Sequence, residues 1–217
     1  MLRALGGVLR DGDRVLVIDD SSPDGTGGAA DRLAAELGYV GVLHRPSREG
    51  LGPAYLAGFR RALDDGAELV LEIDCDFSHD PADVPRLIAE AEAGTDLVLG
   101  SRYVAGGSVA DWGLVRRAIS RGAAVYTGLF LHMGVHDPTG GFKCFRRRVL
   151  ETIDLDAIGS QGYAFQIETT YRAKRAGFTI VELPIRFADR ERGHSKMSRA
   201  IVLEAMWRVP MLRLRIR

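Results

Sequence analysis

Residues 68–81, ELVLEIDCDFSHDP, join an apolar run to a cluster of acidic and hydroxyl side chains. The run Glu68–Ile73 predicts a buried β-strand that stops at Asp74, and Asp80 before a proline is typical of a helix start. In an extended backbone Asp74 and Asp76 point the same way. Two such carboxylates at the mouth of a buried strand indicate a site for Mg²⁺ or Mn²⁺, although a pair of aspartates capping a helix remains an alternative.

Strand-like runs alternate with helical patterns on both sides of this stretch. The predicted strands are Arg14–Ile18, Tyr39–Leu43, Glu68–Ile73, Asp96–Leu99, Thr139–Arg146 and Phe178–Leu183. The predicted helices are Thr26–Leu37, Gly52–Asp65, Pro81–Ala93, Leu114–Met133, Ala164–Ala176 and Ser198–Arg213. This alternation predicts an α/β fold with a mostly parallel sheet flanked by helices, in which ligands bind beyond the carboxyl ends of the strands.

The composition suits an ordinary globular domain. The 217 residues are 46% hydrophobic and 27% charged, and 29 basic side chains balance 29 acidic ones. That balance argues against a general nucleic-acid-binding protein. Two isolated cysteines, Cys75 and Cys144, give neither a disulfide framework nor a zinc pattern and favour a reducing compartment. We expect neither a membrane span nor a secretory signal.

The neutral total hides an asymmetry. Residues 186–217 contain nine Lys or Arg and three Asp or Glu, an excess of six positive charges that the rest of the chain offsets. Apolar side chains such as Trp207 and Met211 are interleaved with these basic residues. The pattern predicts either a helix packed on the domain or a helix lying on an anionic membrane surface.

Two further groups of residues suggest binding chemistry. Asp19 and Asp20 follow the first predicted strand, and a simple turn does not explain two adjacent carboxylates, which can accept hydrogen bonds from a base or a ribose. The other group is basic, lies outside the regular core pattern and can donate to phosphate. For any one of these basic residues, solvated surface charge is the simpler explanation. They are Arg102, Arg116, Arg117, Arg190 and Lys196.

Six motifs in one order resemble those of the polyprenol (dolichol) monophosphate mannose synthases, over roughly residues 14–200. The motifs are DDSSPDGT at 19–26, DCDFSHDP at 74–81, GSRY at 100–103, DPTGGFKCF at 137–145, GYAFQIE at 162–168 and RERGHSKM at 190–197. Members of that family are inverting family 2 glycosyltransferases with a glycosyltransferase-A fold. The resemblance implies GDP-mannose as donor and polyprenyl (dolichyl) phosphate as acceptor.

The resemblance also implies roles for single residues. Asp19 and Asp20 are expected to hold the nucleoside, and Asp74 and Asp76 to hold the metal on the diphosphate. Ser78 is expected near the sugar. The expected catalytic residues are Asp76, Arg102, Arg117 (or Arg116), Arg190 and Lys196, and the expected donor- and metal-binding residues are Asp19, Asp20, Asp74, Cys75, Asp76, Ser78, Arg190 and Lys196. Cys75 replaces the alanine usual in the family, and its backbone can still serve.

The chemistry is consistent with such residues. A departing nucleoside diphosphate needs its charge neutralised, which a metal and arginines supply. The attacking phosphate monoester is already ionised near neutral pH, so no catalytic histidine or glutamate has to be found. Positioning is expected to provide most of the rate.

The expected organisation is a catalytic domain at 1–197 and a basic amphipathic helix at 198–217. We expect a cytoplasmic protein, peripheral at the cytosolic face of a membrane, with a membrane-protein partner as an open possibility. Members of the family begin with a further strand that ends in a Pro-x-Tyr-Asn-Glu motif. That strand is expected to be absent from this chain, which would leave an unpaired edge beside Arg14–Ile18.

Other functions stay open at this stage. A polyprenyl-phosphate glucosyltransferase using UDP-glucose and an inert sugar-nucleotide-binding subunit fit the same motifs. In a phosphatase of the haloacid-dehalogenase type, Asp74 would be the nucleophile and Asp76 the acid/base, but the later acidic pair of that family is not found. A dinucleotide dehydrogenase lacks its Gly-x-Gly-x-x-Gly turn.

Overall fold

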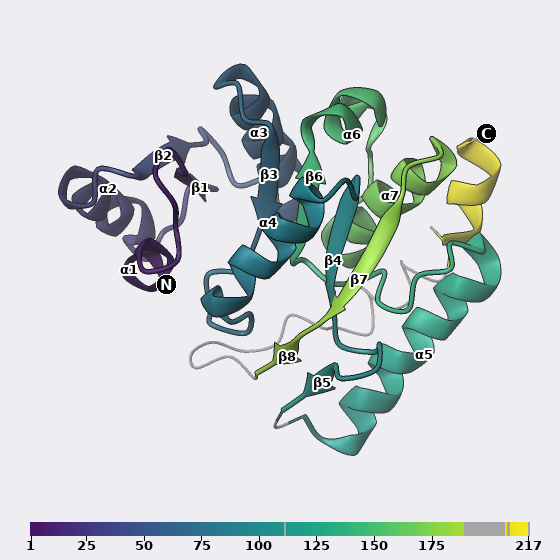
Figure 1. Cartoon of the computed structure of the whole chain (residues 1–217). Helices are drawn as coiled ribbons and strands as arrows, with labels where there is room; N and C mark the ends of the chain where they lie inside the picture. The colour runs from purple at the N-terminus through teal and green to yellow at the C-terminus, as the bar shows by residue number, and fades with distance from the viewer. Residues whose placement is uncertain (111, 189–206, 208, 217) are drawn as a thin grey trace.

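The structure is a computed structural model that describes residues 1–110, 112–188, 207 and 209–216. Figure 1 shows a central sheet with helices on both faces and a smaller β1–β2 unit beside it. The helix α5 runs along one side of the molecule toward the C-terminal end of the chain. The predicted α/β architecture is confirmed.

The central sheet has four strands in the order β3 (Leu69–Glu72), β6 (Lys143–Arg146), β4 (Leu97–Ser101) and β7 (Ile180–Pro184). β6 runs antiparallel to both β3 and β4, while β4 and β7 are parallel. Because β3 and β4 both oppose β6, their carboxyl ends lie at the same edge of the sheet. The residues that follow these two strands are therefore brought together.

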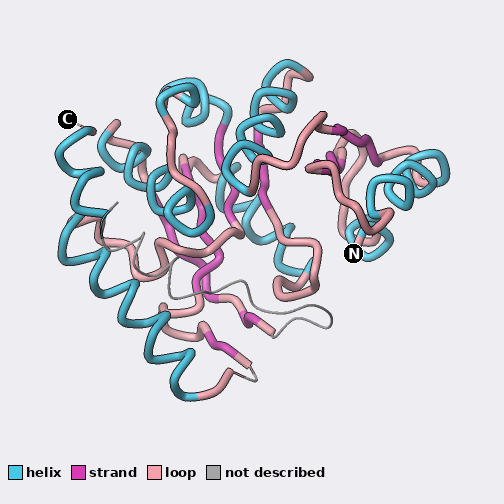
Figure 2. Tube along the Cα trace, turned by 180° about the vertical axis from the view of Figure 1, so that it is seen from behind, coloured by secondary structure: helices cyan, strands magenta, loops and turns pink. Residues whose placement is uncertain are grey.

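The side chains of β4 alternate between the two faces of this sheet. Leu97 and Leu99 belong to one hydrophobic cluster, and Val98 belongs to the other. All three side chains are fully buried, since a central strand has covered faces on both sides. Helices therefore have to cover both faces, as the tube view in Figure 2 also shows.

Helices from distant parts of the chain cover these faces. α3 (Leu51–Asp64), α6 (Arg147–Thr152), α7 (Gly162–Arg175) and residues 209–212 contribute to the cluster around Leu97. α4 (Val84–Glu92), which follows a 3₁₀ turn at Pro81–Asp83, packs on the other face with α1 (Leu2–Gly6). The predicted cap is present, because the Asp80 side chain accepts a hydrogen bond from the Ala82 amide at 2.9 Å.

A second, two-stranded parallel sheet is formed by β1 (Val15–Asp19) and β2 (Val40–His44), with α2 (Thr26–Glu36) as the crossover helix. Within the described residues, no strand pairs with both this sheet and the four-stranded one. Helix α3 packs on β1 so closely that a Cβ at Gly58 would lie 2.3 Å from Ile18 Cδ1.

Most predicted elements match the observed ones to within two residues, and the exceptions are informative. The predicted strand at 139–146 is wrong in its first half, because residues 139–142 form a loop with two glycines and only β6 is extended. Of the predicted last helix, Ser198–Arg213, residues 207 and 209–213 are helical and the others lie outside the described residues; the helix continues to residue 215. The sequence did not predict α1, α6 or the two-residue strands β5 (Ser108–Val109) and β8 (Arg186–Phe187).

The first turn of α3 supplies a test of the packing. A Cβ at Gly52 would lie 2.6 Å from the backbone oxygen of Ser160. We expect Gly52→Ala to lower the free energy of unfolding by about 1–3 kcal/mol, measured by urea denaturation, because backbone has to move. Gly28→Ala on α2, where a Cβ would meet nothing closer than 3.7 Å, is the matched control and should be neutral or stabilising. Equal effects of the two substitutions would contradict this account of the α3 contact.

Candidate active site

The candidate site lies where β3 and β4 end and where the chain enters β6. Asp74 follows β3 by two residues, Arg102 follows β4, and the loop 137–142 precedes β6. A Cβ at Gly141 would lie 3.7 Å from Asp74 Oδ1 and 3.4 Å from Gln166 Nε2. The loop before β6 therefore lies beside the Asp74 carboxylate and the Gln166 side chain.

A tight turn holds the second carboxylate. Asp76 Oδ1 accepts hydrogen bonds from the Ser78 amide at 3.1 Å and from Ser78 Oγ at 2.5 Å. Phe77, between them, has a φ of 60°, a left-handed conformation that an ordinary residue adopts only where its surroundings require it. The Ser78 side chain is buried and serves to orient Asp76. Its expected place near the sugar stays a prediction.

The buried His79 side chain packs against this turn. Its Nδ1 accepts a hydrogen bond from the Asp74 amide at 3.4 Å, and its ring stacks on Phe142 with centroids 5.0 Å apart. Burial and the positive charge of Arg102 lower the pKa of His79 to about 4. The ring is therefore neutral near pH 7 and acts as a hydrogen-bond acceptor rather than as a charge.

The two aspartates fit a cation that is shared with a substrate. Within the described residues, no group of three or more His, Cys, Asp or Glu side chains could hold a metal. The Asp74 side chain is 35% exposed, so a ligand can reach it. Mg²⁺ and Mn²⁺ are commonly held by one or two carboxylates together with phosphate oxygens, which matches two carboxylates and no closed cage. Cys75 is exposed and belongs to neither the turn contacts nor the ion pairs described here.

A buried ion pair lies beneath Asp74. Glu72 is fully buried, and its Oε1 lies 3.8 Å from Nζ of the equally buried Lys143. Lys143 Nζ also donates to the Gln166 backbone oxygen at 2.8 Å and to Gln166 Oε1 at 2.5 Å. Burial, opposed by Lys143 and reinforced by the charge of Asp74, raises the pKa of Glu72 to about 7. Burial lowers the pKa of Lys143 to about 8.

The other predicted acidic pair, Asp19 and Asp20, forms hydrogen bonds and ion pairs within the protein. Asp19 is buried at the end of β1, where Oδ1 accepts from the Ser22 amide at 3.2 Å and Oδ2 lies 3.3 Å from His44 Nδ1. The hydrogen bonds from Ser22 lower the pKa of Asp19. Asp20 pairs with Arg45 and accepts from the Gly50 amide at 2.8 Å, which positions the start of α3. Contact of Asp19 and Asp20 with a nucleoside stays a prediction.

Arg102 was predicted to contact phosphate. In the structure its side chain is 7% exposed and forms two hydrogen bonds with Asp137, from Nε at 2.7 Å and from Nη2 at 2.6 Å. The guanidinium also lies 5.2 Å from the centroid of the Phe187 ring and 5.7 Å from that of Trp112. A buried, neutralised arginine fixes the loop before β6. Contact of Arg102 with a phosphate stays a prediction.

Of the remaining basic candidates, the structure describes two and leaves two outside the described residues. Arg117 is exposed near the start of α5 and donates from Nη2 to the Val109 backbone oxygen at 2.9 Å. The Arg116 guanidinium lies 4.0 Å from the Trp112 ring centroid. The predicted residues Arg190 and Lys196 lie outside the described residues. Asp137 and Lys143 were quoted in the sequence motif DPTGGFKCF, but no role was assigned to them there.

Comparison with known proteins agrees with this geometry. The profile of glycosyl transferase family 2 matches residues 1–154. The chain belongs to this family. Two curated relatives are each 50% identical: the polyprenol monophosphomannose synthase of Mycolicibacterium smegmatis over 196 residues, and the undecaprenyl-phosphate mannosyltransferase of Micrococcus luteus over 192. The first alignment covers 90% of this chain and 74% of the relative, and the second covers 88% and 79%.

Solved structures of this family of folds are also similar. The glucosyl-3-phosphoglycerate synthase of Mycobacterium tuberculosis, in complex with Mn²⁺, UDP and phosphoglyceric acid, superposes with a TM-score of 0.66 at 21% identity. That match covers 99% of this chain and 71% of the other. At this identity the likeness establishes the glycosyltransferase-A fold, and the chain is a glycosyltransferase by family.

The buried pair of Arg102 and Asp137 gives a stability test. We expect Asp137→Asn to lower the free energy of unfolding by about 3–5 kcal/mol in urea denaturation, because it leaves the Arg102 charge buried without compensation. Asp65→Asn, which removes the exposed pair with Arg61, is the matched control and should cost about 0.5 kcal/mol. A loss for Asp137→Asn as small as the control would show that Arg102 is not held as an internal ion pair in solution.

Proposed function

We propose that this chain transfers mannose from GDP-mannose to polyprenyl monophosphate with inversion and releases GDP. The observation that carries the proposal is the pair of carboxylates, Asp74 and Asp76, oriented at the end of β3 in a chain half identical to two mannosyltransferases named for polyprenyl acceptors. A nucleotide donor with a diphosphate suits this arrangement, because its oxygens can occupy the coordination positions of a divalent cation that two carboxylates leave open.

Asp74 and Asp76 would hold Mg²⁺ or Mn²⁺, which neutralises charge on the departing diphosphate when bound. The solved fold neighbour contains Mn²⁺ together with UDP, which supports the use of a divalent metal by this fold. The Ser78 hydroxyl and amide hold Asp76 in place, and the loop at Gly141 lies beside Asp74. These contacts pre-position the carboxylates, so little reorganisation is needed when the donor binds.

The acceptor supplies its own nucleophile. An ionised oxygen of the polyprenyl phosphate attacks C1 of the mannose, the bond from C1 to the diphosphate oxygen breaks, and the electron pair leaves with GDP. No proton has to be removed from the nucleophile, so the neutral His79 and the buried Glu72 need not act as bases. Alignment of the two reactants is then the main contribution of the protein.

An exposed apolar surface supports contact with a lipid. Within the described residues eleven large hydrophobic side chains are exposed, and nine of them lie on α5 (Leu114–Leu131) or at 207–214. They are Leu114, Val115, Ile119, Val125, Leu129, Phe130, Trp207, Met211 and Leu214. We call this surface the apolar face. Basic side chains on the same two segments, among them Arg117 and Arg213, suit an anionic membrane surface.

A pocket lies between this face and the end of β4. Its volume is about 210 Å³, and its lining combines Tyr103, which follows Arg102, with Val135 and His136, which precede Asp137. The opposite wall comes from α5 residues, including Val125 of the apolar face. Such a pocket would place the lipid-linked phosphate near the end of β4. In the described part of the chain, no helix is both long and apolar enough to cross a membrane.

A donor panel tests the proposed reaction. The full chain is incubated with GDP-mannose, UDP-glucose or UDP-N-acetylglucosamine and a short polyprenyl phosphate, with Mn²⁺, with Mg²⁺ or with a chelator. We expect a mannosylated lipid phosphate from GDP-mannose alone, and no product with the chelator. Transfer from UDP-glucose instead would replace the proposed donor, and donor binding without turnover would indicate an inert sugar-nucleotide-binding subunit.

Asp76→Asn tests the role of the second carboxylate. We expect a loss of at least about 100-fold in turnover, because the carboxylate charge is removed where it opposes a cation. The melting temperature should stay close to that of the unchanged protein, since asparagine keeps an oxygen to accept the Ser78 hydrogen bonds. Asp156→Asn, at the exposed pair with Arg60, is the control and should keep full turnover. Full turnover in Asp76→Asn would remove this residue from the metal site.

A further inference from the structure

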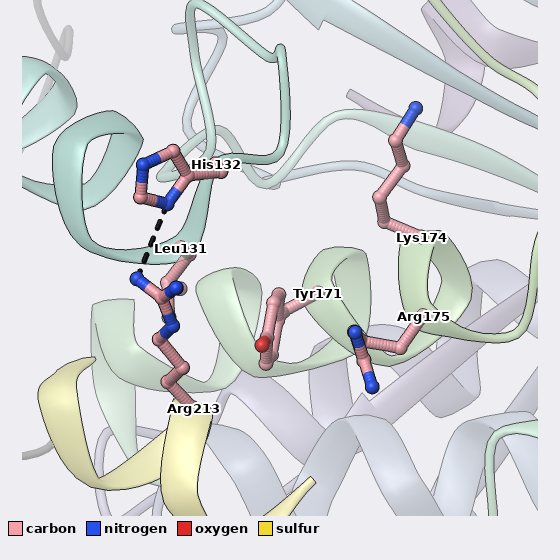
Figure 3. Close-up of a pocket in the computed structure, with 6 residues that line it drawn as sticks. All are labelled: Leu131, His132, Tyr171, Lys174, Arg175 and Arg213. Atoms are coloured by element: carbon pink, nitrogen blue, oxygen red, sulfur yellow. Dashed lines mark hydrogen bonds between the residues drawn. The ribbon is translucent and has the colours of Figure 1, made fainter. Parts of the chain in front are cut away.

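A second pocket, distinct from the proposed site, opens among three helices. Its volume is about 360 Å³, and it is lined by Leu131 and His132 at the end of α5, by Tyr171, Lys174 and Arg175 of α7, and by Arg213. Figure 3 shows Tyr171 between Arg213 on one side and Lys174 and Arg175 on the other. Leu131 and Tyr171 are buried, while the charged side chains are exposed. The pocket therefore has an apolar floor and a basic rim.

Local contacts direct Arg213 toward this rim. His132 ends α5 in a left-handed conformation, with a φ of 50°. Arg213 Nη1 donates to the Phe130 backbone oxygen at 3.0 Å and lies 3.3 Å from His132 Nδ1 (Figure 3). The guanidinium thus satisfies one of the last carbonyls of α5, and its remaining donors are left for another partner.

The positive charge of the rim has no acidic partner among the described residues. None of the ion pairs between described residues involves Lys174, Arg175 or Arg213. The neighbouring Arg172 shows the contrast, because its Nη2 pairs with Glu168 Oε1 at 2.9 Å. Three like charges around one pocket repel one another, and a bound anion relieves that repulsion.

The position of the pocket separates it from the catalytic chemistry. Helix α7 contacts the site through Gln166 in its second turn and reaches the pocket at its last turn. A helix of this length spans about 20 Å, so the pocket and the proposed metal site lie at opposite ends of α7. The pocket borders the apolar face, since Phe130 and Leu214 adjoin its lining residues Leu131 and Arg213 in the chain and are exposed.

We propose that this pocket binds the phosphate of an anionic membrane phospholipid and so fixes the orientation of the chain on the membrane. Arginine donates to two phosphate oxygens at once, and lysine adds a compact charge. Free phosphate shares this chemistry, but only a lipid explains why the basic rim adjoins exposed apolar side chains. The inference rests on the membrane contact of the proposed function and is independent of the transferred sugar.

The test measures binding to vesicles without donor or polyprenyl phosphate. The full chain is sedimented with vesicles of neutral phosphatidylcholine, or of phosphatidylcholine with phosphatidylglycerol. We expect Lys174→Gln with Arg175→Gln to weaken binding to the anionic vesicles roughly 30-fold, from about fivefold for each basic side chain near the surface. Lys174→Arg with Arg175→Lys keeps the charges and should bind as the unchanged chain does. Arg14→Gln with Arg32→Gln, exposed at the other end of the molecule, is the charge-matched control and should change binding less than twofold.

Two outcomes would overturn the proposal: equal binding of the unchanged chain to neutral and anionic vesicles, or equal losses in the pocket variant and the control. A cooperative thermal transition of the pocket variant shows that it is folded. A further arm adds inorganic phosphate: a raised melting temperature without any vesicle binding would assign the pocket to a free anion. Sugar transfer to a short polyprenyl phosphate in detergent should be the same in the pocket variant as in the unchanged chain. A failure of the proposed reaction would therefore be detected independently of vesicle binding.

Discussion

The buried pair of Arg102 and Asp137 is the interaction on which the site depends. Arg102 extends from the end of β4, and Asp137 opens the loop that leads into β6. The same loop is tied to β7, because Glu182 accepts from the amides of His136 at 2.8 Å and Asp137 at 2.9 Å. Two neighbouring strands therefore hold one loop, and that loop carries Gly141 against Asp74.

This arrangement places much negative charge at one edge of the sheet. Glu72, Asp74 and Asp76 follow one another along the end of β3, and Lys143 is the cation buried beside the first of them. The pKa of Glu72 is raised because its burial is only partly offset by Lys143. An edge with this excess favours binding of a further cation, which is the role that a nucleotide-bound metal would fill.

The sequence predicted the fold well because its signals are local. Apolar runs that end in polar clusters located β1, β3 and β4, and Asp80 before a proline located the start of the helical segment that contains α4. The sequence could not show that Arg102 is internal, because a motif gives the residue and not its partner 35 positions away. Lys143 was hidden in the same way: a lysine within an expected strand gives no sign that Glu72 and Gln166 surround it. The two-residue strands β5 and β8 depend on a distant pairing and have no periodic pattern of their own.

Helix α5 has a consequence for the geometry of any reaction at an interface. It is one uninterrupted helix of 18 residues. It begins after the loop that follows β5 and ends beside the basic rim of the pocket at His132. Because such a helix is rigid, tilting it relative to the membrane moves its two ends in opposite directions. If lipids hold the end at His132 more deeply, the end near β5 rises, and the distance that a lipid-borne phosphate must travel to reach the sugar changes.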